Sequence, residues 1–316
     1  MRLGKAILLR LLFGVLSLVF ISFVTFMADE ISPGDAATVL AGEKASPAYV
    51  IDLRHKMGLD RPWPIRYVEY VGHISHGDFG NSYYGTKEPV SEILARTLPI
   101  TLKIALLAII LASALGIFFG TVAAVFQNGF ADWTMLSIST LGVTLPNFVL
   151  APILVEIFAQ QLNVLPDTWS TQMVAPEIYY LILPVVILSA QTCALLTRLT
   201  RASMIDTLQQ EFIRTAVAKG VPRMRLILRH ALRNAILPVI TSIGVSFGVL
   251  LTGSFVVETY FTIPGIGSTT IEALQRGNMP VVQAGVFVTG GIFIVLNLVV
   301  DLLLPLLDPR IRGSQV

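Results

Sequence analysis

The sequence predicts an all-α polytopic membrane protein with six transmembrane helices. Of its 316 residues, 54% are hydrophobic and only 13% are charged, whereas roughly 25% are charged in a soluble domain. Six apolar segments are long enough to cross the hydrocarbon layer of a bilayer. None shows the alternation of barrel strands over about ten residues. A helix is the structure that satisfies the backbone of such a segment internally.

The first apolar segment, residues 6–28, is expected to be a retained span. A signal peptide also begins with basic residues, but its apolar part usually has about 7 to 15 residues and precedes a small-residue cleavage site. Here the apolar run approaches the roughly 20 residues of a transmembrane helix, and no clear A-x-A site follows. Residues 1–28 are therefore predicted to form an N-terminal transmembrane helix.

Five further spans follow a long polar segment, residues 29–100. This segment contains Pro and Gly punctuation, and apolar residues recur at helical spacing in 46–59 and 64–75. A small, partly helical region outside the membrane is expected there. Its His73, His76 and Asp78 are interpreted as surface-turn residues, because three possible ligands without a supporting shell are weak evidence for metal. The five later spans are predicted at 101–125, 135–161, 178–202, 235–259 and 281–304.

The basic residues orient these segments. Short cytoplasmic loops carry an excess of Lys and Arg, and with the N-terminus inside, the short outside loops 162–177 and 260–280 contain only Arg276. Both termini are therefore expected to be cytoplasmic. The loop 126–133 has no Lys or Arg and does not inform the assignment. The cations placed inside are Arg2, Lys5, Arg198, Arg201, Arg214, Lys219, Arg223, Arg225, Arg229, Arg233, Arg310 and Arg312.

The resulting organisation has four parts. They are the span 1–28, an extracytoplasmic segment 29–100, a five-helix core 101–304 with a cytoplasmic loop 203–234, and a cytoplasmic tail 305–316. Pro146 and the other prolines near or inside spans are expected to produce kinks.

Several function classes have no support in the residues. The net charge of +2 is too small to indicate nucleic-acid binding. The single cysteine, Cys193, lies in an apolar run and offers no disulfide framework. The chain contains no G-x-x-x-x-G-K-[ST], HExxH or GxSxG motif, so we expect no catalytic residue, no metal site and no nucleotide bound by this chain.

Cations cluster around a Gly-Val-Pro break in residues 211–238. Residues 211–219 are predicted to form a short helix with Phe212 and Ala216 on one face, which Gly220 ends in the left-handed conformation. Pro222 then suits the start of a second helix. That second helix has an apolar stripe of Met224, Ile227, Leu228, Ala231, Leu232 and Ala235.

Two roles remain open for this loop on physical grounds. The second helix suits an interfacial hairpin whose arginines meet anionic lipid head groups. The first helix carries small side chains and Gly220, which suit insertion into a groove of another protein. Docking is preferred over lipid anchoring, and membrane lipid stays an expected contact.

The loop closely resembles a known one. Residues 211–240, EFIRTAVAKGVPRMRLILRHALRNAILPVI, resemble the cytoplasmic loop of the inner-membrane permeases of peptide and nickel ABC importers, the dipeptide and oligopeptide permease family. The resemblance extends over nearly the whole chain, because stretches spread along it resemble landmarks of the first, B-type subunit. They are SPGDAA (32–37), MGLDRPWPIRYVEYV (57–71), HGDFGNSY (76–83), TLPITLKIALLA (97–108), GVTLPNF (142–148), VVETYFTIPGIG (256–267) and LLDPRIR (306–312).

The resemblance implies a type I ABC importer permease fold, a bacterial cytoplasmic (inner) membrane location and a transport role as half of a heterodimeric pore. The implied partners are a second homologous permease, two ATPase subunits that bind ATP and Mg, and an extracytoplasmic solute-binding protein. Peptide is the preferred substrate; a nickel or metal-chelate importer is the alternative, and a stand-alone channel or secondary transporter is a more distant one. The general importer loop has Glu-Ala-Ala where this chain has Arg214, Thr215 and Ala216, as in the peptide branch. The implied ATPase-coupling residues are Glu211, Phe212, Arg214, Thr215, Ala216, Ala218, Lys219 and Gly220.

Candidates for a translocation path are ionisable or polar groups inside spans. Glu156, near the outer end of the third span, is expected to have an interfacial or local partner, with a pore role as the alternative. Gln191, midway along the fourth span, is expected to bond another helix, or to contact a passing substrate. Small residues that could let helices approach closely are Gly116, Gly120, Gly244, Gly248 and Gly253.

Overall fold

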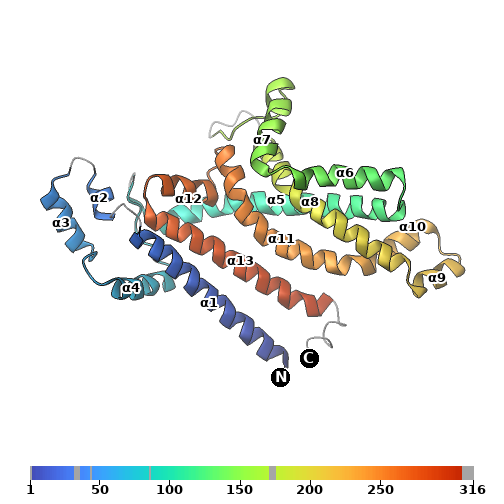
Figure 1. Cartoon of the computed structure of the whole chain (residues 1–316), viewed down its shortest axis with the longest axis horizontal. Coiled ribbons are helices and arrows are strands. Elements are labelled where there is room, and N and C mark those ends of the chain that lie inside the picture. Colours follow the sequence, from blue (N-terminus) through green and yellow to red (C-terminus); the bar gives the residue numbers. More distant parts are fainter. Residues whose placement is uncertain (1, 32–35, 43–44, 85–86, 171–175, 308–316) are drawn as a thin grey trace. The chain divides into compact units, whose positions relative to one another are not determined.

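The computed structural model describes residues 2–31, 36–42, 45–84, 87–170 and 176–307. These residues form helices and one isolated β-bridge, between Asn81 and Pro89. The side chains of Arg2, Lys5 and Asp301, and the tail from residue 308 with Arg310 and Arg312, lie outside the described part. The helices, labelled in Figure 1, are α1 (Arg2–Ile31), α2 (Ala36–Ala41), α3 (Pro47–Lys56), α4 (Trp63–Ser75), α5 (Val90–Val125), α6 (Phe130–Thr144), α7 (Asn147–Val155), π-helix η1 (Glu156–Gln161), α8 (Glu177–Leu208), α9 (Glu211–Ala218), α10 (Arg223–Arg225), π-helix η2 (Leu226–Ala231), α11 (Leu232–Tyr260), α12 (Ile266–Gln275) and α13 (Met279–Leu307).

The chain folds as two compact units. Unit 1 contains Met1–Thr101 and Pro264–Val295, and unit 2 contains Leu102–Ile263 and Leu296–Val316. Two of the three boundaries fall within α5 and α13, so both helices contribute to each unit, and the third lies between α11 and α12.

In unit 1, aromatic side chains pack α4 against α1. The Tyr67 ring lies 5.4 Å from the ring centroids of both Phe23 and Phe26. The Tyr67 hydroxyl also lies 3.0 Å from the hydroxyl of Ser22, which is buried. An ion pair between Arg66 and Glu30 joins the same two helices. The two stretches predicted to be helical in 29–100 correspond to α3 and α4.

A buried asparagine ties two distant loops of unit 1 together. The Asn278 side chain accepts a hydrogen bond from the backbone N–H of Tyr83 at 3.0 Å and donates one to the Ser82 hydroxyl at 2.8 Å. Nearby, the backbone N–H of Ile266 donates to the Thr101 hydroxyl at 2.9 Å. Because unpaired polar groups are costly in a low-dielectric interior, the two Asn278 bonds fix the loop before α5 to the α12–α13 turn, and the Thr101 bond fixes the start of α12 to α5.

Five described helices are long and apolar enough to span a membrane, and the count reaches six if a bent pair is one span. They are Leu8–Ile31, Val90–Val125, Glu177–Leu208, Arg223–Tyr260 and Met279–Val300, with Phe130–Thr144 and Asn147–Gln161 as the bent pair. The third predicted span, 135–161, is therefore not one helix. The chain turns by 107° where Pro146 precedes α7, because proline disfavours a helical conformation in the residue before it. Figure 1 shows α7 leaving the direction of α6.

Glycines allow α8 to pack closely against its neighbours in unit 2. A Cβ at Gly120 of α5 would lie 2.5 Å from both the Thr197 carbonyl oxygen and the Thr200 Cβ of α8. A Cβ at Gly116 would lie 2.6 Å from the Leu196 Cβ. Real side chains do not tolerate such distances, so close helix approach at these two predicted positions is confirmed.

The other predicted glycines behave differently from one another. A Cβ at Gly244 would collide with the Val300 side chain, so this position also requires glycine. A Cβ at Gly253 would meet only Leu188 Cδ1 at 3.6 Å, which is an ordinary contact. Gly248 is buried in α11. Close packing in unit 2 therefore depends on particular glycines rather than on glycine content.

Candidate functional site

The short helix α9 follows α8 after a two-residue turn and lies near its end (Figure 1). The backbone of Gln210 is extended, and its carbonyl accepts from the N–H of Ile213 at 3.0 Å to start the helix. The Thr215 hydroxyl donates to the Glu211 carbonyl at 3.1 Å. The short helix predicted at 211–219 is thus confirmed at Glu211–Ala218.

One face of α9 is buried against its own chain. Ile213 is 4% exposed and Ala216 is 9% exposed. Both belong to a cluster whose other buried members are Ala124, Met204, Leu226, Ile227, Ala231 and Ala235. Phe212, predicted to share a face with Ala216, is 39% exposed. Ala216 therefore holds α9 to α8, η2 and α11, and its side chain is not on the exposed face.

The opposite face of α9 forms a short exposed stripe, Glu211, Arg214, Thr215 and Ala218. These residues follow i, i+3, i+4 and i+7 spacing, which places them on one side of a helix, and all are exposed. Arg214 and Glu211 form an ion pair at 2.8 Å that also lies in solvent. Phe212 and Lys219 border the stripe and are exposed as well.

Gly220 ends α9 in the left-handed conformation, with φ of 72°. The backbone N–H of Val221 donates to the Ala216 carbonyl at 3.2 Å, and that of Gly220 donates to the Val217 carbonyl at 2.9 Å. This pair of bonds is a Schellman motif, and its usual apolar contact is present because Val221 packs on the cluster that contains Ala216. The left-handed cap predicted at Gly220 is confirmed.

The second helix differs from the predicted stripe because it contains a π-helical turn, η2. One extra residue per turn shifts the register of the side chains. Leu226 and Ile227 are both buried, whereas Met224 and Leu228 are 69% and 54% exposed. Ideal α-helical spacing wrongly places Met224 and Leu228 in the same stripe as Ile227.

Two contacts join the C-terminal part of α8 to α11 and to α6. The Ser203 hydroxyl of α8 donates to the Ala235 carbonyl of α11 at 2.7 Å. Arg201 of α8 donates from Nε and Nη2 to the two carboxylate oxygens of Asp132, at 2.7 and 2.6 Å. Asp132 lies in residues 126–133, the segment that does not inform the orientation of the spans. The sequence signal that could have singled it out is an acidic residue in the first turn of a helix.

The two candidate path residues lie on exposed surfaces of unit 2. Glu156 begins η1 and accepts a hydrogen bond from Gln161 at 3.2 Å, which is a local partner. Gln191 is exposed on α8, and the described residues give its side chain no hydrogen bond. The bond to another helix expected for Gln191 is therefore absent from the described part of this chain.

His73, in the last turn of α4, and His76, directly after that helix, make local contacts. His73 Nδ1 lies 3.2 Å from Asp78, and His76 Nδ1 lies 2.9 Å from the Gly72 carbonyl oxygen. Across residues 2–307, leaving out the undescribed gaps, no group of three or more His, Cys, Asp or Glu side chains is arranged to hold a metal ion.

A solved structure shares the fold. The crystal structure of an amino acid ABC transporter with histidines aligns with a TM-score of 0.51, covering 70% of this chain and 94% of that one, at 17% identity. At this identity the likeness concerns the fold alone.

Curated relatives align over almost the full length. A probable peptide ABC transporter permease protein of Sinorhizobium fredii is 36% identical over 312 residues, 98% of this chain and 99% of the relative. A glutathione transport system permease protein of Salmonella choleraesuis is 36% identical, over 97% and 98% of the two chains. A putative peptide transport system permease protein of Brucella abortus is 34% identical, over 97% and 98%.

Two family descriptions match adjoining parts of the sequence. Residues 3–105 match the N-terminal region of binding-protein-dependent transport system membrane components. Residues 116–313 match the binding-protein-dependent transport system inner membrane component itself. With its apolar helices and its full-length relatives, this chain belongs to the family of binding-protein-dependent transport system inner membrane components, as a multi-pass inner-membrane ABC permease of the dipeptide and oligopeptide type.

Proposed function

We propose that the chain is the permease subunit of an ATP-driven importer of di- or oligopeptides. The observation that carries the proposal is the near full-length similarity to permeases named for peptides and for glutathione, which is itself a tripeptide. A shared substrate class in relatives of about one-third identity supports peptide over a nickel chelate, because none of the three relatives described above is named for a metal.

The chain works with partners that supply binding and energy. Two ATPase subunits bind ATP and Mg, a second homologous permease forms the other half of the pore, and an extracytoplasmic solute-binding protein delivers the peptide. The family description, which names dependence on a binding protein, supports this assembly. Both termini and the α8–α11 loop are cytoplasmic in it, as the distribution of Lys and Arg favours.

The stripe of Glu211, Arg214, Thr215 and Ala218 is the surface that meets the ATPase. This stripe is short and exposed, and it includes the small side chain of Ala218. The opposite face of α9 is buried in its own chain. Phe212 and Lys219 extend the contact at one edge. Ala216 and Gly220 act indirectly, by holding the helix and ending it.

Movement of the ATPase reaches the membrane through α9. The Schellman motif and the cluster around Ile213 join α9 to α8 and α11 without a flexible linker. A displacement of α9 therefore moves these two helices together and shifts the pore between outward-open and inward-open states, as a bistable interface allows. Gln191, exposed on α8, and Glu156 face the path or the second permease.

Transport is tested with the complete complex in liposomes. The solute-binding protein faces the liposome lumen. In separate experiments it is loaded with labelled dipeptide, tripeptide, free amino acid or nickel chelate, and ATP-dependent transfer of the label across the bilayer is measured. Peptide transfer is the expected result. Transfer of nickel chelate without peptide, or transfer by this chain with no ATPase present, would refute the assignment.

Coupling is tested by two changes at one exposed position. Ala218→Arg places a long charged side chain on the stripe, and we expect at least a tenfold loss of ATPase co-purification and of transport. Ala218→Ser keeps a small side chain and should leave both unchanged. Equal ATPase binding and equal transport in the two variants would show that α9 is not the docking element. Neither variant alters the buried face, so the permease itself should be retained.

A further inference from the structure

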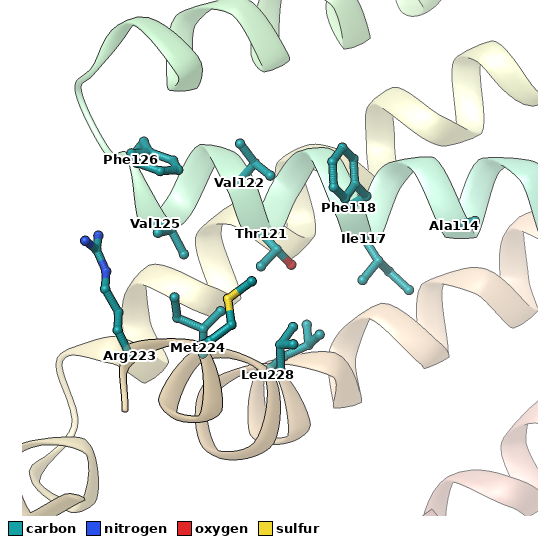
Figure 2. Close-up of a pocket in the computed structure, with 12 residues that line it drawn as sticks. Ala114, Ile117, Phe118, Thr121, Val122, Val125, Phe126, Arg223, Met224 and Leu228 are labelled. Atoms are coloured by element: carbon teal, nitrogen blue, oxygen red, sulfur yellow. The ribbon is translucent and has the colours of Figure 1, made fainter. Parts of the chain in front are cut away.

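An apolar groove runs between α5 and the start of the second cytoplasmic helix, within unit 2. It has a volume of about 620 Å³. Ile117, Thr121 and Phe118 of α5 line one side, and Met224 and Leu228 line the other (Figure 2). Met224, Leu228 and Phe118 are all more than half exposed, so the groove is open along its length.

The groove has the length of one leaflet. Its residues on α5 and directly after it extend from Ala114 to Phe126, a distance of about 18 Å at the rise of an α-helix. Half of the hydrocarbon layer is about 15 Å thick. The α5–α6 turn and the start of α6, at one end of the groove, carry exposed Phe126, Phe130 and Trp133, and Trp is enriched at a membrane–water interface. That end therefore lies at head-group level, and Ala114 lies toward the bilayer centre.

A cation stands at the head-group end. Arg223 lines the groove there, and its guanidinium lies 6.0 Å from the Phe126 ring centroid. Figure 2 shows its side chain extending toward Phe126. No carboxylate within the described residues pairs with Arg223. The site thus combines an uncompensated positive charge at the interface with an apolar channel that leads inward.

We propose that this groove binds one anionic phospholipid, with an acyl chain between α5 and η2 and the phosphate on Arg223. The charge decides the occupant. A hydrophobic helix of a second permease would fill the groove but would leave the arginine without a partner, whereas an anionic lipid satisfies both parts of the site. Through the proposed topology the lipid belongs to the cytoplasmic leaflet. It contacts η2, which carries part of the cluster that holds α9.

The experiment places a photo-crosslinking amino acid at Met224 in the complete complex, in nanodiscs of phosphatidylglycerol or of phosphatidylcholine. Mass spectrometry then identifies the adduct. We expect a phospholipid adduct at least fivefold more abundant with phosphatidylglycerol than with phosphatidylcholine. Arg223→Gln should reduce that preference to less than twofold. Arg225→Gln, a change of the same type at an exposed arginine that does not line the groove, should preserve it.

Two results would overturn the proposal. One is an adduct with another protein subunit, which would make the groove a subunit interface. The other is a lipid adduct that is indifferent to the head group and to Arg223→Gln, which would reduce it to bulk lipid contact. The comparison of the two lipids uses the unaltered arginine, so it decides the question even if Arg223→Gln fails to assemble. The result is independent of the transported substrate, because no peptide is present.

Discussion

Arg201 holds Asp132 through two parallel hydrogen bonds, of 2.7 and 2.6 Å, between α8 and the first turn of α6. The Asp132 side chain is 4% exposed and that of Arg201 is 24% exposed. The second carboxylate oxygen also accepts from the backbone N–H of Asn128 at 2.8 Å. One buried carboxylate therefore fixes the α5–α6 turn to α8, seven residues before the end of that helix.

Removing one partner of this pair should be costly. Asp132→Ala leaves Arg201 without this carboxylate; breaking a fully buried ion pair costs about 3–5 kcal/mol, and because the Arg201 side chain is 24% exposed, the expected cost is below that range. We expect a clear loss of thermal stability of the purified complex. The double variant Asp132→Leu with Arg201→Met should recover much of it. Asp52→Asn, which breaks an exposed pair with Lys56, serves as the control and should change little. Similar melting temperatures for Asp132→Ala and the control would contradict this role.

The left-handed backbone at Gly220 predicts a local effect on α9. Gly220→Ala has open space for its Cβ, so only the conformation is penalised, by roughly 1–2 kcal/mol. A cost of about 1.4 kcal/mol makes the locally open state of α9 tenfold more populated. Hydrogen exchange of the α9 amides measures this change. Gly220→Asn should have a smaller effect. Gly72→Ala is the control, because Gly72 is helical and also has open space for a Cβ. Hydrogen exchange in its helix, α4, should not become faster. Unchanged α9 exchange in Gly220→Ala would show that the cap does not stabilise the helix.

The contact between α5 and α8 predicts opposite outcomes for two glycines. Gly120→Ala places a Cβ against the Thr197 carbonyl oxygen, and such overpacking costs about 1–3 kcal/mol. Gly253→Ala meets only a side-chain atom at 3.6 Å and should be neutral or slightly stabilising, since alanine favours helix. Thermal unfolding in detergent measures both. Equal stability of the two variants would mean that α5 and α8 do not pack this closely.

The asparagine of unit 1 predicts a loop that opens when its bonds are lost. Asn278→Ala removes the hydrogen bonds that its side chain makes with the Tyr83 N–H and the Ser82 hydroxyl, each worth about 0.5–1.5 kcal/mol. Limited proteolysis should then cut within residues 76–89 at least several-fold faster. Asn81→Ala, in the same loop but with an exposed side chain, is the matched comparison. Faster cleavage in both variants would assign the effect to the loop in general.

The sequence by itself determined the helical membrane class, the approximate position of the spans, the short helix at 211–219 and the glycine that ends it. These features depend on hydropathy and on local backbone preferences, which neighbouring residues specify. It also identified Gly116, Gly120 and Gly244 as possible close contacts, without deciding which glycines are required.

Only the tertiary structure decided which sides of these helices are used. It turned the third apolar segment by 107° at Pro146, and it placed Ala216 inside its own chain while leaving Ala218 exposed. It also paired Asp132 with Arg201, 69 residues away. Periodicity shows that a helix has two faces, but the partner of each face is set by segments distant in the chain. Side-chain burial, register shifts at a π-turn and long-range ion pairs are therefore properties of the packed molecule.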